Sequence, residues 1–203
     1  MAVTKKFSAE RICEAYEAGL REFGENYVQE FAAKRPQLER MEDARFHLIG
    51  HLQSNKAAQA CALFDVIETA DSPKLLERLD RAANERGRPM EVLIEIKLSE
   101  EQAKTGADPK EVPDLLQRAG ACANLRVTGL MTMPPWSTDA EQSRPYFQHL
   151  AKLAREYGLP QLSMGMSNDF EVAIEEGATL IRIGTALFGP RPKPQPADAS
   201  ITL

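Results

Sequence analysis

Two basic residues near opposite ends of the chain have side chains that could hold a cofactor. Lys5 ends the short apolar segment 2–5, and Arg182 lies between two isoleucines in another apolar segment. If both segments are strands, alternation puts Lys5 on the same face as Val3 and Arg182 on the face opposite the isoleucines. A lysine amine can condense with a carbonyl group to form a Schiff base, and a buried arginine needs a polar partner. A solvated strand-end lysine and a structural ion pair remain the alternatives at this stage.

Two short turns add groups that could hold a phosphate. Gly184 and Thr185 directly follow Arg182, and the Gly-Met-Ser run at 165–167 precedes a predicted helix. Backbone N–H groups in such turns can bind anions, although each turn alone is also compatible with an ordinary loop. Together with Lys5 they offer partners for the imine carbon, the phosphate and the pyridine nitrogen of pyridoxal 5′-phosphate (PLP). The combination therefore predicts a PLP site.

Alternating strand and helix patterns follow the whole chain and indicate how these residues meet. Eight strands that alternate with helices fit either an open doubly wound sheet or a closed barrel, and eight is the strand number of the (β/α)8 barrel. We therefore expect an α/β fold, a single (β/α)8 barrel of the TIM type, with the site at the C-terminal ends of the strands. Predicted strands are 2–5, 21–24, 45–49, 66–69, 91–98, 126–131, 161–164 and 179–183, and predicted helices are 8–18, 27–42, 55–63, 73–86, 110–122, 140–157 and 169–176.

Composition argues against several other classes of function. The chain has 203 residues, a net charge of -5 and basic residues scattered among acidic ones, so no nucleic-acid partner is expected. No apolar run approaches the ~20 residues that span a bilayer, and no signal-peptide pattern follows Met1, so we expect a cytoplasmic protein without a membrane partner. The three widely spaced cysteines are expected to be reduced. Four prolines within 190–196 predict a flexible tail over 190–203, after a single domain over 1–189.

Five sequence runs resemble those of the YggS/PROSC family of PLP homeostasis proteins, in order and over nearly the whole chain up to the tail. Members of that family fold like the barrel domain of alanine racemase, and their PLP lysine lies in a V-[ST]-K segment. Here that segment is Val3-Thr4-Lys5, so the resemblance implies that Lys5, and not Lys6, holds PLP as a Schiff base. The runs are FGENYVQE (23–30), HLIGHLQSNK (47–56), GLMTM (129–133), LSMGMS-DF (162–170) and RIGTALFG (182–189).

The resemblance also implies roles for the other candidate residues. An arginine at the pyridine nitrogen would disfavour protonation of that nitrogen through like-charge repulsion. The ring would then be a poor electron sink, so the site is suited to holding PLP without substantial turnover. The implied set has Arg182 at the pyridine nitrogen; Ser167, Gly184, Thr185 and the backbone at Met166 at the phosphate; Asn26 near the ring or its hydroxyl; and His47 as a further lining residue.

Several functions remain to be weighed on this basis. The resemblance implies a non-enzymatic, monomeric PLP homeostasis protein with PLP-dependent apo-enzymes as possible partners. An amino-acid racemase needs acid/base groups on both faces of the substrate carbon, and related racemases take one from a separate β-domain that is not expected after residue 189. A lysine Schiff-base aldolase without PLP is the third alternative. His47 and His51 do not share a helical face, so no metal site is expected.

Two departures from the family pattern concern the start of the chain and the phosphate loop. Family members usually carry a helix and loop before the first strand, whereas only four residues precede Lys5 here. We therefore expect a barrel that lacks the usual leading helix. Asn168 stands where alanine is more usual. Neither departure removes a proposed PLP contact.

Overall fold

Eight parallel strands follow one another around a single sheet, in the order of the sequence. The structure, a computed structural model, describes residues 1–99 and 105–190, so nearly all of the expected tail over 190–203 lies outside the described residues. The predicted (β/α)8 barrel is confirmed. Its strands are β1 (Ala2–Val3), β2 (Glu22–Glu25), β3 (Arg45–Leu48), β4 (Val66–Ala70), β5 (Met90–Glu95), β6 (Leu125–Met131), β7 (Gln161–Met166) and β8 (Leu180–Arg182).

The first and last strands close the barrel through a short parallel contact. Ala2 pairs with Ile183. The backbone N–H of Val3 donates to the carbonyl of Ile183 at 2.8 Å, and the N–H of Ile183 donates to the carbonyl of Met1 at 3.0 Å. Closure therefore brings the segments that carry Lys5 and Arg182 together, although the two residues are far apart in the sequence.

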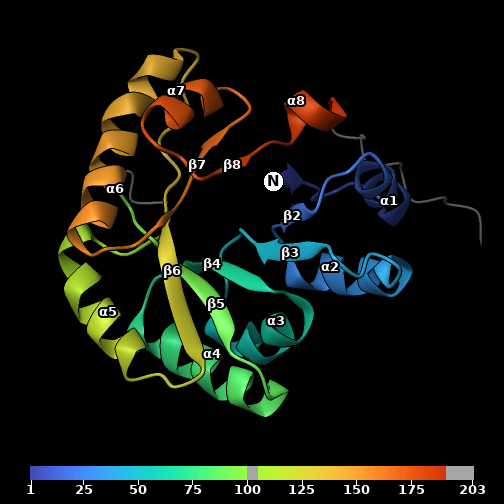
Figure 1. Ribbon diagram of the computed structural model, residues 1–203, viewed down its shortest axis with the longest axis horizontal. Helices are drawn as coiled ribbons and strands as arrows, with labels where there is room; N and C mark the ends of the chain where they lie inside the picture. The colour runs from blue at the N-terminus through green and yellow to red at the C-terminus, as the bar shows by residue number, and fades with distance from the viewer. Residues whose placement is uncertain (100–104, 191–203) are drawn as a thin grey trace, which may run out of the picture.

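Helices cover the outside of the ring of strands (Figure 1). The longest, α4, begins with Pro73 at its first position and ends before Gly87, whose φ of 76° is favourable for glycine. The α-helices are α1 (Ala9–Glu17), α2 (Val28–Lys34), α3 (Ala57–Leu63), α4 (Pro73–Arg86), α5 (Val112–Gly120), α6 (Arg144–Glu156), α7 (Phe170–Glu175) and α8 (Thr185–Phe188). Short 3-10 helices are η1 (Arg35–Leu38), η2 (Ser54–Lys56), η3 (Pro109–Glu111) and η4 (Ala140–Ser143).

Three of the differences from the sequence prediction have clear physical causes or lie near the site. The helix expected over 27–42 is α-helical only to Lys34 and continues as the 3-10 turn η1, because Pro36 has no N–H with which to extend the α-helical hydrogen bonds. The strand expected over 91–98 ends at Glu95, and Ile96 makes only an isolated bridge. The helix α8 was not predicted from the sequence, since its four residues are too few to show a helical pattern.

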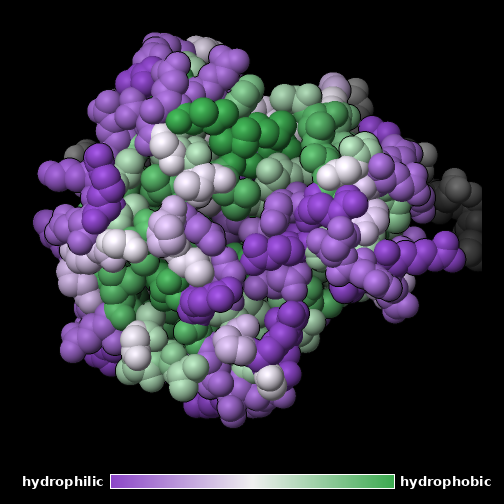
Figure 2. Space-filling model, viewed as in Figure 1, coloured by the Kyte–Doolittle hydropathy of each residue, from purple (hydrophilic) through white to green (hydrophobic). Residues whose placement is uncertain are grey.

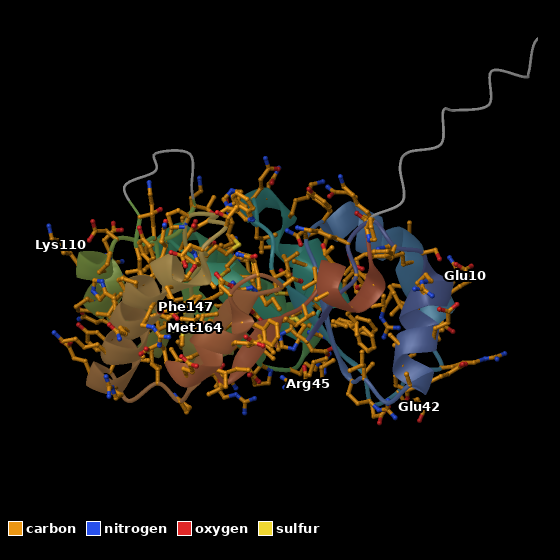
Figure 3. All side chains as sticks on the ribbon, turned by 90° about the horizontal axis from the view of Figure 1, so that it is seen from above. Glu10, Glu42, Arg45, Lys110, Phe147 and Met164 are labelled. Atoms are coloured by element: carbon orange, nitrogen blue, oxygen red, sulfur yellow. The ribbon has the colours of Figure 1, made fainter. Side chains whose placement is uncertain are left out.

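Side chains alternate between the helix layer and the barrel interior. The outward residues of β5, such as Val92 and Ile94, belong to the large core between sheet and helices, whereas Leu93 packs inside the barrel with Val66 and Met131. Phe147 and Met164, labelled in Figure 3, belong to the large core between sheet and helices, whereas Glu10 and Lys110 project from the surface. Buried charged side chains occupy the barrel interior on either side of the cluster of Leu93, Val66 and Met131. Some of them belong to the candidate site described below.

The surface is mainly hydrophilic over the helices, with hydrophobic residues gathered between α7 and α8 on the face shown in Figure 2. Ile174 on α7 and Leu187 on α8 are among the exposed large hydrophobic residues. Within the described ranges, no helix combines the length and apolar character required to cross a membrane. The three cysteines are free thiols.

Candidate functional site

A cavity of about 260 Å³ lies where β1, β7 and β8 end. Seven of the eight candidate residues line it: Lys5, Asn26, Met166, Ser167, Arg182, Gly184 and Thr185. The remaining lining residues are Val3, Ile49, Met133, Pro135, Trp136, Ser137, Asn168 and Asp169. The cavity thus joins residues from both termini with the loop that follows β6, which alternation along single strands could not reveal.

Both neighbours of Lys5 are fixed to the adjacent strand and helix. The N–H of Thr4 donates to the carbonyl of Gly24 at 2.9 Å, and its hydroxyl donates to Glu25 Oε1 at 2.8 Å. Lys6 has a φ of 66°, which turns the chain sharply after Lys5. The N–H of Lys6 donates to Glu30 Oε1 at 2.5 Å. Lys5 therefore projects from a backbone that is held on either side.

Lys34 of α2 connects these contacts from behind. Its Nζ donates to the carbonyl of Thr4 at 3.1 Å and lies 2.9 Å from Glu25 Oε1 and 2.6 Å from Glu30 Oε1. Glu25 is fully buried. Burial raises the pKa of the Glu25 carboxyl, and the charge and hydrogen bond of Lys34 oppose that rise. The lysine cation thus favours an ionised Glu25 that can hold the β1 end.

Arg182 enters the barrel interior, as alternation along its strand predicts. The side chain is buried, and its Nη1 donates to Ser163 Oγ while Nη2 donates to the carbonyl of Thr132, each at 2.8 Å. Burial lowers the pKa of Arg182, an effect that the charge of Glu68 opposes. A guanidinium remains charged even so, because its ordinary pKa lies far above neutrality. The cavity therefore contains a fixed cation anchored from β6 and β7.

The two glycine- and hydroxyl-containing turns meet at one side of the cavity. Ser167 Oγ accepts a hydrogen bond from the N–H of Ala186 at 3.3 Å, near the start of α8. The first N–H groups of a helix lack partners within it, and in barrels the loops after strands seven and eight with a short extra helix often bind phosphate. Gly184 and Thr185 stand at this helix start. The two turns therefore place a hydroxyl and a helix start side by side next to Arg182.

Met166 lines the cavity, but its backbone N–H is already engaged. That N–H donates to Asp169 Oδ1 at 2.7 Å, and Asp169 Oδ2 accepts from the hydroxyl of Ser143 at 2.8 Å. The buried Asp169 carboxylate thereby fixes the turn between β7 and α7. In this structure the turn contributes the Ser167 side chain to the cavity, and the Met166 N–H holds the turn itself.

Asn26 supplies an unused polar atom at the cavity wall. Its Oδ1 is buried without a hydrogen-bond partner in the structure. The backbone of Asn26 passes so close to Gly50 that a Cβ there would lie 2.2 Å from the Asn26 carbonyl oxygen, so this approach requires glycine. Buried polar groups are nearly always paired, so this oxygen is available to a polar group that enters the cavity. A primary amine, a guanidinium, hydroxyls and an unpaired amide together fit PLP.

His47 does not line the cavity. It lies on β3 between two carboxylates, with Nδ1 2.7 Å from Glu68 Oε1 and Nε2 2.5 Å from Glu22 Oε2. Burial opposes its protonation, but the hydrogen bonds that it donates to Glu22 and Glu68 outweigh that effect and raise the pKa of His47 to about 9. The residue was expected beside the cofactor. The structure instead places it deeper in the barrel as a charged partner of two glutamates.

Two further residues, Glu95 and Trp136, belong to the surroundings of the site. Glu95 is buried at the end of β5, where Oε1 accepts from Thr105 Oγ1 at 3.0 Å and Oε2 has no partner in the structure. Burial raises the pKa of its carboxyl to about 7. Trp136 lines the cavity although its side chain is largely exposed, and its loop is tied down where Asn168 Nδ2 donates to the carbonyl of Ser137 at 2.7 Å. A charged strand residue and an aromatic loop residue are too common to mark a site alone.

Comparison with known proteins agrees with this geometry. The sequence pattern of the alanine racemase N-terminal domain family matches residues 1–192. A pyridoxal phosphate homeostasis protein from Aquifex aeolicus is 42% identical over 197 residues, which cover 94% of this chain and 86% of the relative. One from Schizosaccharomyces pombe is 38% identical, over 100% of this chain and 88% of the relative.

Solved structures show the same likeness. PipY from Synechococcus elongatus, solved with PLP bound, is 41% identical over 93% of this chain and 91% of its own, with a TM-score of 0.85. Alanine racemase from Clostridium difficile is 12% identical, covers 95% of this chain and 52% of its own, and has a TM-score of 0.72. At that identity the racemase shares the fold alone.

The fold and the cavity define a barrel of the alanine racemase N-terminal domain class, with a lysine at the end of the first strand. Within that class, the near-complete matches at about 40% identity are more specific. The chain belongs to the family of pyridoxal phosphate homeostasis proteins.

Proposed function

We propose that this chain binds PLP in the cavity, holds it as a Schiff base on Lys5, and serves PLP homeostasis rather than catalysis. One observation carries the proposal: a lysine amine, a buried arginine and the hydroxyl turns after β7 and β8 line the same cavity. The relatives named for PLP homeostasis and the PLP-bound PipY structure support it.

Each lining group has a distinct part in this proposal. PLP supplies an aldehyde, with which the Lys5 amine condenses to form an imine with loss of one water. Ser167 in the turn after β7, with Gly184 and Thr185 at the start of α8, takes the phosphate, where backbone N–H groups favour an anion. Arg182 faces the pyridine nitrogen, and Asn26 and Met166 border the ring.

The arginine is the reason for proposing a holding role rather than a catalytic one. A guanidinium beside the pyridine nitrogen disfavours a second positive charge there, which weakens the ring as an electron sink. We propose that the protein acts in the cytoplasm as a monomer and passes PLP to PLP-dependent apo-enzymes.

Chemical trapping tests the proposal directly. Protein incubated with PLP should gain a visible absorption band that disappears on borohydride reduction. Peptide mass spectrometry should then find the reduced adduct on Lys5. Lys5→Ala should abolish the band, whereas the neighbouring Lys6→Asn should keep it, since asparagine tolerates the left-handed backbone at that position.

The possible results separate the candidate functions. A colourless protein that gains no band with PLP contradicts the proposal. Trapping of Lys5 by a phosphorylated carbonyl substrate in the absence of PLP would instead support a lysine Schiff-base aldolase. Sustained racemisation of free amino acids by the PLP-loaded protein would contradict the holding role while leaving PLP binding intact.

A further inference from the structure

A chain of polar side chains, all buried except the half-exposed Glu22, crosses the barrel interior and ends at Arg182. His47 Nε2 lies 2.5 Å from Glu22 Oε2, and its Nδ1 lies 2.7 Å from Glu68 Oε1. On the other side, Ser163 Oγ donates to Glu68 Oε2 at 2.5 Å and accepts from Arg182 Nη1 at 2.8 Å. The chain therefore connects β2, β3 and β4 with β7 and β8.

The proton positions along this chain follow from its chemistry. A carboxylate oxygen faces each ring nitrogen of His47, so both nitrogens are donors and the ring is protonated. Glu68 is an acceptor on both oxygens, which requires Ser163 to give its only proton to Glu68. The Ser163 oxygen is then left as an acceptor for the arginine. No member can change its role without leaving a buried group unpaired, which is costly.

The charges along the chain also balance. Arg182 and His47 are cations, and Glu68 and Glu22 are the anions that face them. Glu95 and Asp169 add negative charge near Arg182 from β5 and from the β7–α7 turn. Buried charges persist where they are paired and hydrogen-bonded. Arg182 is thus held by the Thr132 carbonyl and by the Ser163 hydroxyl, and through that hydroxyl by Glu68.

We propose that Ser163 and Glu68 are positioning residues that fix the Arg182 guanidinium at the cofactor's pyridine nitrogen and offset its charge. His47 and Glu22 in turn hold Glu68 in place. The inference rests on the proposed PLP site and deepens it. It says that residues outside the cavity determine the position and the electrostatic surroundings of the arginine at the cofactor ring. Neither Ser163 nor Glu68 lies among the cavity-lining residues.

Two variants test the positioning role without removing the cavity wall. Ser163→Ala removes the hydroxyl, and Glu68→Gln keeps the shape of the side chain but removes its charge. Each should weaken PLP binding about tenfold, because one hydrogen bond to a charged group is lost. Competition by inorganic phosphate should be unchanged, since the phosphate turns are separate. The double variant should lose little more than either single one, as expected for residues acting as a unit.

A spectroscopic readout distinguishes positioning from general stabilisation. The pH midpoint of the visible band should move to lower pH in Glu68→Gln, because loss of an interior negative charge disfavours the protonated imine. Glu91→Gln is the matched control. Glu91 is also a buried barrel carboxylate, but it binds Arg45 and Arg126 at the opposite mouth. It should alter neither PLP affinity nor the midpoint.

The outcomes separate this inference from the proposed function. A band absent from the unmodified protein overturns both. A normal band with unchanged PLP affinity and midpoint in folded Ser163→Ala and Glu68→Gln overturns the positioning role alone. Equal losses of PLP and phosphate binding, or the same losses in Glu91→Gln, would show a general effect on the fold and would also overturn it.

Discussion

Ser167 contributes to the site in two ways, as a cavity-lining hydroxyl and as the acceptor for the Ala186 N–H. In Ser167→Ala/Thr185→Ala, we expect PLP affinity to fall by about tenfold for each hydroxyl that binds the phosphate. The Lys5 adduct should still form at high PLP concentration, and inorganic phosphate should compete only weakly. Titration of the visible band with and without phosphate measures both effects.

Ser137 provides the matched control for that experiment. It lines the same cavity, but its hydroxyl accepts from the N–H of Asp139 within its own loop. Ser137→Ala should therefore leave phosphate competition unchanged. Undiminished phosphate competition in the Ser167/Thr185 variant would mean that the phosphate is held elsewhere.

For single residues, the sequence predicts which face of a strand a side chain occupies, but it does not predict how deep in the barrel the side chain lies. Alternation correctly placed Arg182 in the barrel interior, because a two-residue period determines the side of a strand. The same logic says nothing of how far along the barrel axis a side chain lies. His47 shares the interior but lies below the cavity, next to Glu22 and Glu68. Those two partners come from other strands, so only the closed fold brings them together.

At the scale of elements, helix α2 fixes the end of β1 through Lys34. Removing this lysine leaves Glu25 as an unpaired buried carboxylate. Lys34→Met should therefore lower the free energy of unfolding by about 3 kcal/mol, the usual cost of breaking a buried pair on one side. It should also weaken PLP retention, since the turn that carries Lys5 loses its support. Urea unfolding and the borohydride-trapped fraction report the two effects.

Two further variants make that prediction specific. Lys34→Met/Glu25→Gln should recover part of the lost stability, because the remaining side chain is neutral. Lys74→Met, the same change at an exposed position of α4, should have little effect. If Lys34→Met is as stable as the unmodified protein, the buried pair does not hold the β1 end.

The elements themselves were largely predictable, with errors that have local causes. Strongly periodic segments such as α4 were found with correct bounds, since fourteen residues show a clear apolar stripe. The interruption at Pro36 and the short α8 were missed because one proline or four residues hardly change a periodic pattern. The α8 helix matters most for the site, and only the barrel geometry indicates why a helix would begin at Thr185.

At the scale of the whole molecule, buried ionisable groups make stability depend on pH. Burial raises the pKa of Glu95 from its ordinary 4.5 to about 7. A raised folded-state pKa contributes stability that is present below pH 4.5 and is lost as pH rises through 7. The pKa of His47 is raised from 6.5 to about 9. Its contribution to stability is therefore also lost with rising pH, between pH 6.5 and 9. Stability should therefore decline from mildly acidic to alkaline pH.

Glu95→Gln should remove the first part of this decline. Glutamine can still accept from Thr105 but has no charge to desolvate beside Asp71. At pH 8 the free energy of unfolding of the variant should exceed that of the unmodified protein by up to about 3 kcal/mol. Near pH 4 the two proteins should differ little. Urea unfolding between these two values measures the effect.

Glu91→Gln gives a contrast of opposite sign in the same experiment. Burial opposes ionisation of Glu91, but hydrogen bonds from Gln161 and Arg126 outweigh it and lower its pKa. The stability from Glu91 is therefore present above pH 4.5 and lost as pH falls, so Glu91→Gln should be less stable at pH 8. If Glu95→Gln is also less stable than the unmodified protein at pH 8, burial of the ionised Glu95 carboxylate does not destabilise the fold, and the prediction is wrong. If instead the free energy of unfolding at pH 8 rises in Glu95→Gln and falls in Glu91→Gln, the two carboxylates, at opposite ends of the barrel interior, have opposite effects on folding.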